Sequence, residues 1–390
     1  MPRIFLSAGE ASGEHYGASI IPAIRQLVPD AEFFGLGGQR MEALGFHRIV
    51  RAEDVAVMGI TEVILHMPRI YGEYQKLKAS IRRERPDLAI LIDFPDVNLS
   101  LARHLKRAGV PVLYFVSPQL WAWKKYRIRD VQRYVDRMLV IFPFEEQFYL
   151  NRKVQAAFVG HPLADLPLPQ ISRDAFAREN RLDPSKQWIG LLPGSRAKEI
   201  RLNLPEMVKA AQALQHRSEY EFLLPLAPTL TNAQRAEIQA MLPAVPKIAV
   251  MQDARAALQH ARTSIVASGT ATVEAALIGN PFLVVYRVSP LTYAVAQRVV
   301  DVPHVAMVNL IAGRRVVPEL IQGDFTAENL VSHLQPLLND EGARAEMQTS
   351  LGQISDMLKA KGNPGKSAIE RVAEMASQML DQSKIPQELH

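Results

Sequence analysis

Leu88-Ala89-Ile90-Leu91-Ile92, followed at once by Asp93-Phe94-Pro95-Asp96-Val97-Asn98, is the stretch of sequence that decides the fold. Five consecutive apolar residues are typical of a strand that is buried on both faces, as in a parallel sheet covered by helices. Similar short apolar runs alternate with helical stretches along the chain. The pattern therefore predicts an α/β fold built from repeated β-α units.

The apolar runs form two series, and a length of 390 residues also fits two domains. The first series of expected strands covers 3–7, 32–36, 88–92, 111–116, 138–142 and 156–159. The second covers 188–192, 221–224, 248–251, 263–266 and 282–285. The proline-rich stretch His161–Pro169 between them cannot continue a helix or a central strand, so it is the expected linker. We expect domains over 1–165 and 170–360, with a last helix at about 366–381 packing back on the first domain.

The composition removes several kinds of chemistry. The chain has no cysteine, which excludes disulfides, thiolate zinc sites, Fe–S clusters and a cysteine nucleophile. The ten histidines show no metal-ligand spacing, so we expect no metal and no cofactor. The apolar start is too short for a signal peptide and no run reaches the roughly 18 residues of a membrane span. A cytoplasmic location is the resulting expectation.

Positive charge is concentrated in one segment. Between Arg103 and Arg137 there are nine Lys or Arg residues and two acidic ones, which indicates an anionic partner. Within it, Trp121–Asp130 mixes aromatic and cationic side chains, as surfaces that meet lipid or nucleic acid do, although a solvated helix face is the commoner explanation. Upstream, Val63–Tyr71 is apolar with basic flanks. It is either a buried helix or a patch that touches a membrane.

Two strand ends in the second half have the residues of an anion site. Leu191–Arg196 places the amides of Gly194 and Ser195 beside Arg196, a set of donors that suits a diphosphate. An ordinary βα turn explains the same residues equally well.

The second such turn is Ser268-Gly269-Thr270, which runs from a strand into a strong helix. If Thr270 is the N-cap, the capping-box position is Val273, so Glu274 is left to accept hydrogen bonds from ribose hydroxyls. The alternative is that Glu274 is an acid favoured only by the helix dipole.

Two loops of the first half follow strands in the same way. In Asp93–Asn98, either aspartate could act as a general base, and Asp96 could equally be an N-cap. In Ser7–Gly17, Gly9 and Gly13 allow a ligand close to the backbone, while Glu10 and Glu14 disfavour phosphate. The loop, which also contains Ser12, suits hydroxyls or an amine. A structural turn is the alternative there. His161 either lines the domain junction or is a hydrogen-bonded structural residue.

Taken together, these segments resemble the lipid-A-disaccharide synthases, a family of bacterial glycosyltransferases. The similarity runs through Ser7–Gly17, Val57–Gly59, Asp93–Asn98, Tyr114–Trp123, Pro143–Glu145, Gly160–Pro162, Leu191–Arg196, Ser268–Glu274 and Asn309–Gly313. The chain departs from the family at Glu14, where aspartate is usual, and at Val97, where phenylalanine is usual.

The resemblance implies a GT-B fold, with two Rossmann-like domains facing across a cleft and a C-terminal helix returning to the first domain. It implies transfer of 2,3-diacylglucosamine from its UDP derivative to the 6-hydroxyl of 2,3-diacylglucosamine 1-phosphate, by an inverting, metal-independent reaction that gives a β-1,6 linkage. Asp96 falls on the family's essential aspartate, which would be the general base, and Arg196, Glu274 and Asn309 fall on positions tied to UDP binding or activity.

The resemblance also implies partners. These are the two acylated sugars, the inner face of the inner membrane, which the protein would touch peripherally, and a second copy in a homodimer with exchanged C-terminal segments, but no nucleic acid. Two other functions remain open: a UDP-N-acetylglucosamine 2-epimerase, which shares the fold and the nucleotide half, and a non-catalytic module that binds nucleotide sugars or anionic lipids.

Overall fold

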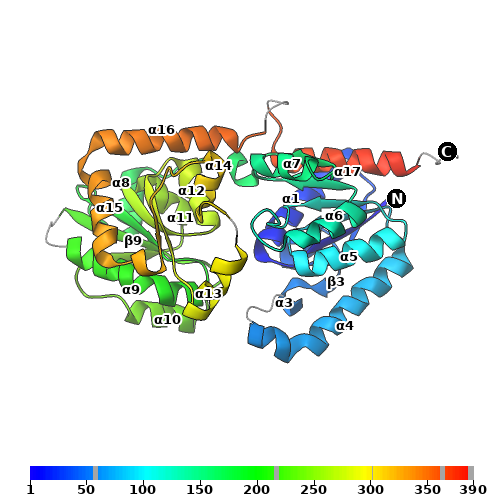
Figure 1. Ribbon diagram of the computed structural model, residues 1–390, viewed down its shortest axis with the longest axis horizontal. Coiled ribbons are helices and arrows are strands. Elements are labelled where there is room, and N and C mark those ends of the chain that lie inside the picture. The colour runs from blue at the N-terminus through cyan, green and yellow to red at the C-terminus, as the bar shows by residue number, and fades with distance from the viewer. Residues whose placement is uncertain (56–59, 215–218, 301, 361–364, 385–390) are drawn as a thin grey trace. The chain divides into compact units, whose positions relative to one another are not determined.

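The computed structural model describes residues 1–55, 60–214, 219–300, 302–360 and 365–384 (Figure 1). The described chain forms two compact units, which are Met1–Asp165 with the residues from Leu358 on, and Leu166–Met357. Each unit contains one sheet whose strands all pair in parallel. The predicted α/β fold with two Rossmann-like domains is therefore confirmed.

The first unit has a seven-stranded sheet in the order β3-β2-β1-β4-β5-β6-β7. In that order the strands are β3 His47–Arg51, β2 Glu32–Gly37, β1 Arg3–Ala8, β4 Leu88–Ile92, β5 Val112–Phe115, β6 Arg137–Val140 and β7 Ala156–Phe158. Its helices are α1 Ala11–Leu27, α2 Gln39–Glu42, α3 Ala52–Val55, α4 Ile60–Glu84, α5 Pro95–Arg107, α6 Ile128–Tyr134, α7 Pro143–Leu150 and α17 Ala368–Lys384, with short 3₁₀ turns η1 Lys125–Arg127 and η2 Pro162–Asp165.

The last helix, α17, packs along α1 although the two are far apart in sequence (Figure 1). Its apolar residues recur at helical spacing, and Val372, Ala376 and Leu380 are fully or almost fully buried. The amide of Ala368, its first residue, donates to the carboxylate of Asp165 at 2.7 Å. The C-terminal segment is thus part of the core of the first unit.

The second unit has a six-stranded sheet in the order β10-β9-β8-β11-β12-β13. In that order the strands are β10 Ile248–Met251, β9 Tyr220–Pro225, β8 Gln187–Leu192, β11 Thr263–Ala267, β12 Phe282–Tyr286 and β13 Glu319–Ile321. Its helices are α8 Arg173–Asn180, α9 Ala197–Leu214, α10 Asn232–Ala240, α11 Ala254–His260, α12 Thr270–Ile278, α13 Pro290–Val299, α14 Met307–Ala312, α15 Ala327–Asn339 and α16 Glu341–Met357, with the 3₁₀ turn η3 Gln322–Asp324.

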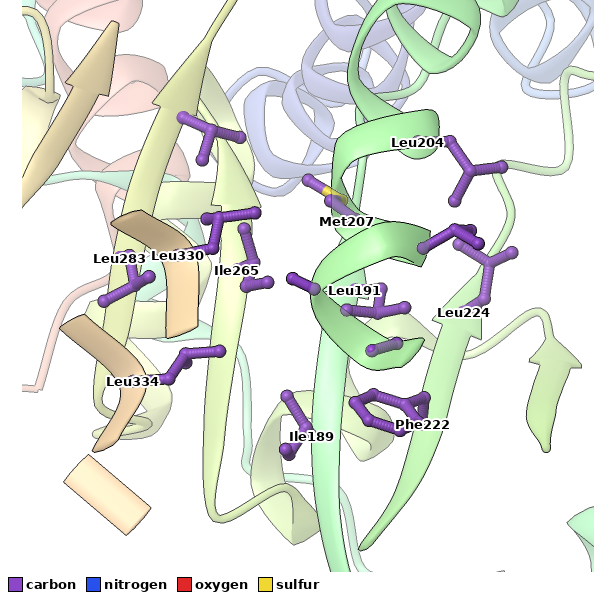
Figure 2. Packing of buried hydrophobic residues seen from close by; sticks show 14 of the residues in the cluster. Ile189, Leu191, Leu204, Met207, Phe222, Leu224, Ile265, Leu283, Leu330 and Leu334 are labelled. Carbon is purple, nitrogen blue, oxygen red and sulfur yellow. The ribbon is translucent and has the colours of Figure 1, made fainter. Parts of the chain in front are cut away.

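Strand residues of the second unit alternate between two hydrophobic clusters, because successive side chains of a strand point to opposite faces. Figure 2 shows one cluster, in which Phe222 and Leu224 of β9 pack with Met207 of α9. The intervening Leu223 belongs to a second cluster with Trp188. Both faces of the sheet are therefore covered, as the uninterrupted apolar runs predict.

Every expected strand overlaps an observed one, and two further strands appear at sheet edges. β3 and β13 each pair with a single neighbour. β3 carries two arginines and a histidine, and β13 is three residues long. Neither has the apolar run by which the central strands are found in the sequence.

Candidate active site

The first candidate site lies where the strand order of the first unit reverses. The chain builds β2 and β3 on one side of β1 and then β4 to β7 on the other. Ala8 is in register with Ile92, so the loops that begin at Gly9 and Asp93 leave the sheet side by side. Ligands of open α/β sheets bind at such a switch point. Two segments that the sequence analysis singled out therefore meet here.

The Gly9 loop is closely packed against its neighbour. A Cβ atom on Gly9 would lie 2.3 Å from the ring of Phe94, so only glycine fits there. Gly13 is buried against Ala8 and Ile92, whereas Ser12 is exposed. Glu10 is the N-cap residue of α1 without a side-chain cap hydrogen bond. Of the four predicted acceptor-loop residues, Glu10 and Ser12 are thus the ones whose side chains can reach a ligand.

Glu14, where the chain departs from the family, has a structural partner. Its carboxylate accepts a hydrogen bond of 2.8 Å from the amide of Arg40 at the start of α2. A Cβ atom on Gly38 would collide with the same carboxylate. The side chain of Glu14 thus anchors the turn after β2.

Asp93 sits on a strained backbone next to this loop. Asp93 and Phe94 both have positive φ angles, 47° and 49°, which non-glycine residues rarely adopt. The buried Asn98 holds this conformation, because its Nδ2 donates to the Asp93 carbonyl at 2.7 Å and its Oδ1 accepts from Ser7 Oγ at 2.6 Å. The hydroxyl of Tyr114 donates to the same carbonyl at 2.6 Å. These hydrogen bonds fix the backbone from which the Asp93 carboxyl projects.

The environment of Asp93 makes it a better base than an ordinary aspartate. Burial, with a smaller contribution from the negative charge of Glu10, raises its pKa to about 6, although a hydrogen bond from the Phe94 amide opposes the rise. A carboxylate that titrates near neutrality can take a proton and still be ionised at physiological pH.

Asp96, the predicted base, has a different environment. It lies in the first turn of α5, whose N-cap is Phe94, so the N-cap role considered for Asp96 is wrong. Its carboxylate forms ion pairs with Arg127 and with Lys124, the latter at 3.5 Å. Partial burial alone would raise the pKa of Asp96, but the hydrogen bond and charge of Arg127, with those of Lys124, lower it below the usual value.

The segment that brings Lys124 and Arg127 to Asp96 is held by a buried carboxylate. Glu145, at the start of α7, accepts hydrogen bonds from Ser117 Oγ at 2.7 Å and Trp121 Nε1 at 3.0 Å. Burial raises the pKa of Glu145 to about 7, and these hydrogen bonds partly offset the rise. Nearby, burial lowers the pKa of His161 to about 4, and its Nδ1 accepts from the Leu163 amide. These contacts favour the structural interpretation of His161.

A second switch point lies in the second unit, between β8 and β11. Leu192 is in register with Val266. The turn Pro193–Arg196 and the turn Ser268–Thr270 therefore lie side by side, at the carboxyl ends of two adjacent strands. The two predicted anion-binding turns are brought together in this way, each in front of a helix N-terminus.

The first turn already contains a carboxylate. Glu199, in the first turn of α9, accepts from the amides of Ser195 at 3.2 Å and Arg196 at 3.4 Å, and from the Arg196 guanidinium at 3.1 Å. Gly194 has a φ of 122°, and a Cβ there would lie 2.6 Å from the same carboxylate. The Ser195 amide and the Arg196 guanidinium, two of the donors predicted to bind a diphosphate, thus converge on one carboxylate together with the Arg196 amide.

The second turn leads into α12, whose N-cap lies one residue before Thr270, the N-cap that the sequence suggested. Gly269, with a φ of 151°, is the N-cap of α12, so Thr270 is the first helical residue and not the cap. Ser268 Oγ donates to the Val305 carbonyl at 3.3 Å. Glu274 is half-buried, and its pKa is raised by burial, opposed by the charge of Arg255. It is not a capping residue, which keeps its carboxylate available to a ligand.

Asn309 is buried among internal partners. Its Oδ1 accepts from the amides of Val316 and Val317, and its Nδ2 donates to Glu319 Oε1 at 2.8 Å. Glu319 in turn accepts from the Val305 and Ala306 amides. The side chain of Asn309 therefore holds the 305–309 segment, which lies beside Ser268.

One predicted surface, Val63–Tyr71, is only partly described, because the side chains of residues 63–67 lie outside the described residues. Val57–Gly59, one of the segments of the family resemblance, also lies outside them. In the described part of Val63–Tyr71, which belongs to α4, Pro68, Arg69 and Tyr71 are exposed. Within the described chain, no helix is both long and apolar enough to cross a membrane.

Local sequence patterns locate these residues but not the partners that surround them. Glu10 beside Asp93, the cations on Asp96, and Glu199 in the first turn come from the fold. Only Glu199 has a local signal, because an acid three residues after Arg196 falls in the first turn of the predicted helix.

Two parallel sheets with loop sites at their switch points define the class, which is that of α/β proteins with two Rossmann-like domains. Solved structures of this class include a putative UDP-N-acetylglucosamine 2-epimerase from Listeria monocytogenes, with a TM-score of 0.62, 12% identity and coverage of 100% of this chain and 99% of that one. They also include the calicheamicin glycosyltransferase CalG4, with a TM-score of 0.60, 14% identity and coverage of 99% and 100%.

Sequence comparison gives the family. The model of the lipid-A-disaccharide synthetase family matches residues 4–372. The lipid-A-disaccharide synthase of Acidobacterium capsulatum is 68% identical over 391 residues, covering 97% of this chain and 96% of the relative. That of Koribacter versatilis is 49% identical, with 96% and 97% covered. The chain belongs to the lipid-A-disaccharide synthase family and is a UDP-sugar-dependent glycosyltransferase.

Proposed function

We propose that the protein joins UDP-2,3-diacylglucosamine to 2,3-diacylglucosamine 1-phosphate, forming the β-1,6-linked disaccharide precursor of lipid A and releasing UDP. The observation that carries this proposal is a pair of switch points with complementary chemistry. The first unit offers a carboxyl group with a raised pKa, and the second offers a turn that gathers anion-binding donors. Membership of the family supports the choice of substrates.

The reaction is an inverting displacement at C1 of the donor sugar. The 6-hydroxyl oxygen of the acceptor attacks C1, the C1–O bond to the diphosphate breaks, and its electron pair leaves on UDP. A carboxylate accepts the hydroxyl proton as the new bond forms. Positive groups must neutralise the charge that develops on the diphosphate. In this proposal a carboxylate of the first unit accepts the proton, and the donors of the second unit neutralise the diphosphate without a metal.

Asp93 is the base that the environment of the two aspartates favours. A base must be ionised and must not be engaged by cations, because ion pairing stabilises the charged form and weakens its proton affinity. Asp96 is ion-paired twice, whereas Asp93 is partly desolvated beside Glu10. The assignment of the base to Asp96 remains the alternative, and one experiment distinguishes the two.

In the donor site we assign the diphosphate to Gly194, Ser195 and Arg196 and to the turn Ser268–Thr270. Glu274 would accept hydrogen bonds from the ribose hydroxyls. Asn309 would act by holding the segment beside Ser268. In the acceptor site, Glu10 and Ser12 would contact hydroxyls, with the backbone at Gly9 and Gly13 shaping the loop.

The experiment measures UDP release and disaccharide formation from the two acylated sugars, with Asp93→Asn and Asp96→Asn as the variants. We expect Asp93→Asn to lower kcat by about 10²–10⁴-fold, the usual contribution of a general base. UDP affinity should stay the same, since the nucleotide site lies in the other unit. In the wild type, kcat should fall as the pH drops through about 6.

Each outcome has a distinct meaning. If Asp96→Asn loses turnover while Asp93→Asn keeps it, the base is Asp96. If both keep it, neither aspartate is the base and the assigned mechanism is wrong. If the wild type releases no UDP from these substrates while it binds UDP, the substrate assignment is wrong, and an epimerase assay with UDP-N-acetylglucosamine follows.

We further propose that the protein works on the cytoplasmic face of the inner membrane, as a peripheral protein and as a homodimer with exchanged C-terminal segments. Two acyl chains on each substrate support the membrane location. Exposed aromatic side chains at Trp123 and Tyr126, beside the exposed Lys125, are suited to an interface with lipid. The dimer rests on the resemblance to the family.

A further inference from the structure

We propose that Lys124 and Arg127 form a binding site for a phosphate monoester, and that its ligand is the 1-phosphate of the acceptor sugar. In the structure the site is occupied by the carboxylate of Asp96. The identity of the ligand rests on the function proposed above. The site itself rests on the arrangement of the three side chains.

Both cations converge on a single oxygen. Lys124 Nζ lies 3.5 Å from Asp96 Oδ1, and the guanidinium of Arg127 contacts the same atom. Two positive charges against one negative charge leave the cluster with a net positive charge. A phosphate dianion provides three acceptor oxygens and two negative charges, so it matches this cluster better than one carboxylate does. The positive end of the α5 dipole, at Asp96, adds to the attraction.

The cations are held in place before any ligand arrives. Lys124 has a φ of 50°, and its ammonium lies 4.3 Å from the ring centroid of Trp123. The preceding segment is anchored by the hydrogen bonds of Ser117 and Trp121 to the buried Glu145. A site fixed in this way binds without ordering long side chains, which is the main entropic cost of binding with lysine and arginine.

The burial of the two cations favours a small anion over a membrane surface. The side chains of Lys124 and Arg127 are 29% and 19% exposed, whereas Lys125 and Arg129 on the same segment are exposed. A flat layer of lipid headgroups meets the exposed cations first. A single phosphate group can reach the recessed pair by displacing Asp96, whose side chain is 67% exposed.

The position of the cluster points to the acceptor. Asp96 follows Asp93 by three residues and lies in the first turn of α5, directly after β4, so the cations lie at the same end of the strands as the candidate base. The acceptor carries its reacting 6-hydroxyl and its 1-phosphate on one sugar. The cluster would therefore bind the non-reacting end of the acceptor and orient the hydroxyl, while Asp96 keeps the site shielded when no acceptor is present.

The test compares two acceptors, 2,3-diacylglucosamine 1-phosphate and the same sugar without phosphate, in micelles of neutral detergent. We expect Arg127→Ala and Lys124→Ala to lower kcat/KM about 10–100-fold for the phosphorylated acceptor, mainly through KM, and less than about threefold for the other. Arg82→Ala removes an exposed cation on α4, outside this segment, and is the control, with wild-type values for both. A second measurement needs no turnover: calorimetry of soluble glucosamine 1-phosphate should show binding to the wild type and loss of binding in Arg127→Ala.

Three results would overturn the proposal. Equal losses on both acceptors would mean that the cations only position the loop. Unchanged kinetics and unchanged glucosamine 1-phosphate binding in the variants would mean that the cluster holds no ligand. If the variants keep their preference for the phosphorylated acceptor but no longer sediment with phosphatidylglycerol vesicles, the partner is a lipid headgroup.

UDP affinity is measured alongside these assays. If the wild type binds the sugar phosphate normally but forms no disaccharide, that result would count against the proposed function alone.

Discussion

The proton affinity of a carboxyl group depends on its surroundings, and Glu145 is the clearest case in this chain. The free glutamate pKa is 4.5, and burial raises it to about 7 here, with hydrogen bonds from Ser117 and Trp121 limiting the rise. The folded state therefore favours the protonated form more than the unfolded state does. This contribution to stability is fully present below about pH 4.5 and is lost as the pH rises through about 7.

We expect Glu145→Gln to flatten the pH dependence of stability. Each tenfold change in proton affinity corresponds to about 1.4 kcal/mol, so ionising Glu145 should cost the wild type about 3 kcal/mol of unfolding free energy between pH 4.5 and 8. The variant cannot ionise there, although it should be less stable than the wild type at pH 5, because the side-chain NH2 that replaces one carboxyl oxygen cannot accept the hydrogen bond from the Phe142 amide. Urea unfolding at pH 5 and at pH 8 measures the change in unfolding free energy of each protein. Glu53→Gln removes an exposed carboxyl as the control, and an unchanged slope in Glu145→Gln would contradict the argument.

At the scale of elements, the start of α9 is the informative feature. A helix N-terminus attracts an anion through its unpaired N–H groups and its dipole. Here the chain supplies one, because the Glu199 carboxylate engages the Ser195 and Arg196 amides and the Arg196 guanidinium. A nucleotide diphosphate that uses these donors must displace Glu199, which makes the carboxylate a competitor of UDP.

Glu199→Gln should therefore bind UDP more tightly. A charge at a helix end contributes about 0.3–1 kcal/mol, which predicts a Kd lower by about twofold to fivefold in titration calorimetry. Glu237→Gln on α10 is the matched control, since it removes the same charge from an exposed pair with Arg201. Weaker UDP binding in Glu199→Gln would show instead that Glu199 orients Arg196 for the nucleotide.

The elements also show what a sequence can and cannot predict. Central strands such as Leu88–Ile92 are visible because both faces must be apolar, and the order of β-α units then places Asp93 and Ser195 at sheet edges. The edge strand His47–Arg51 is missed because it lies at the margin of the sheet, where polar side chains can reach solvent and no uninterrupted apolar run is needed. The two cations that form ion pairs with Asp96 are Lys124 and Arg127, which lie about thirty residues further along the chain. Such ion pairs depend on tertiary packing, which a local sequence pattern does not specify.

At the scale of the whole molecule, the first unit is discontinuous in sequence. Its sheet is completed within Met1–Asp165, but its helical layer needs α17, which the chain reaches only after building the second unit. The buried face of α17 rests on α1, so the two units cannot be separated by a single cut that leaves the first intact. Each sheet nevertheless has its own hydrophobic clusters.

Val372→Asp should separate the unfolding of the two units. Val372 is fully buried on α17, and an unpaired charge there should cost the first unit about 3–5 kcal/mol. The core of the second unit contains no residue of α17, so its transition should keep its temperature. Differential scanning calorimetry would then show the first transition at a lower temperature and the second unchanged. Gln378→Asp, on the exposed side of the same helix, is the control and should leave both in place. A shift of both transitions would mean that the units unfold as one. A first transition that also moves with protein concentration would mean that α17 packs on a second copy, as an exchanged dimer requires.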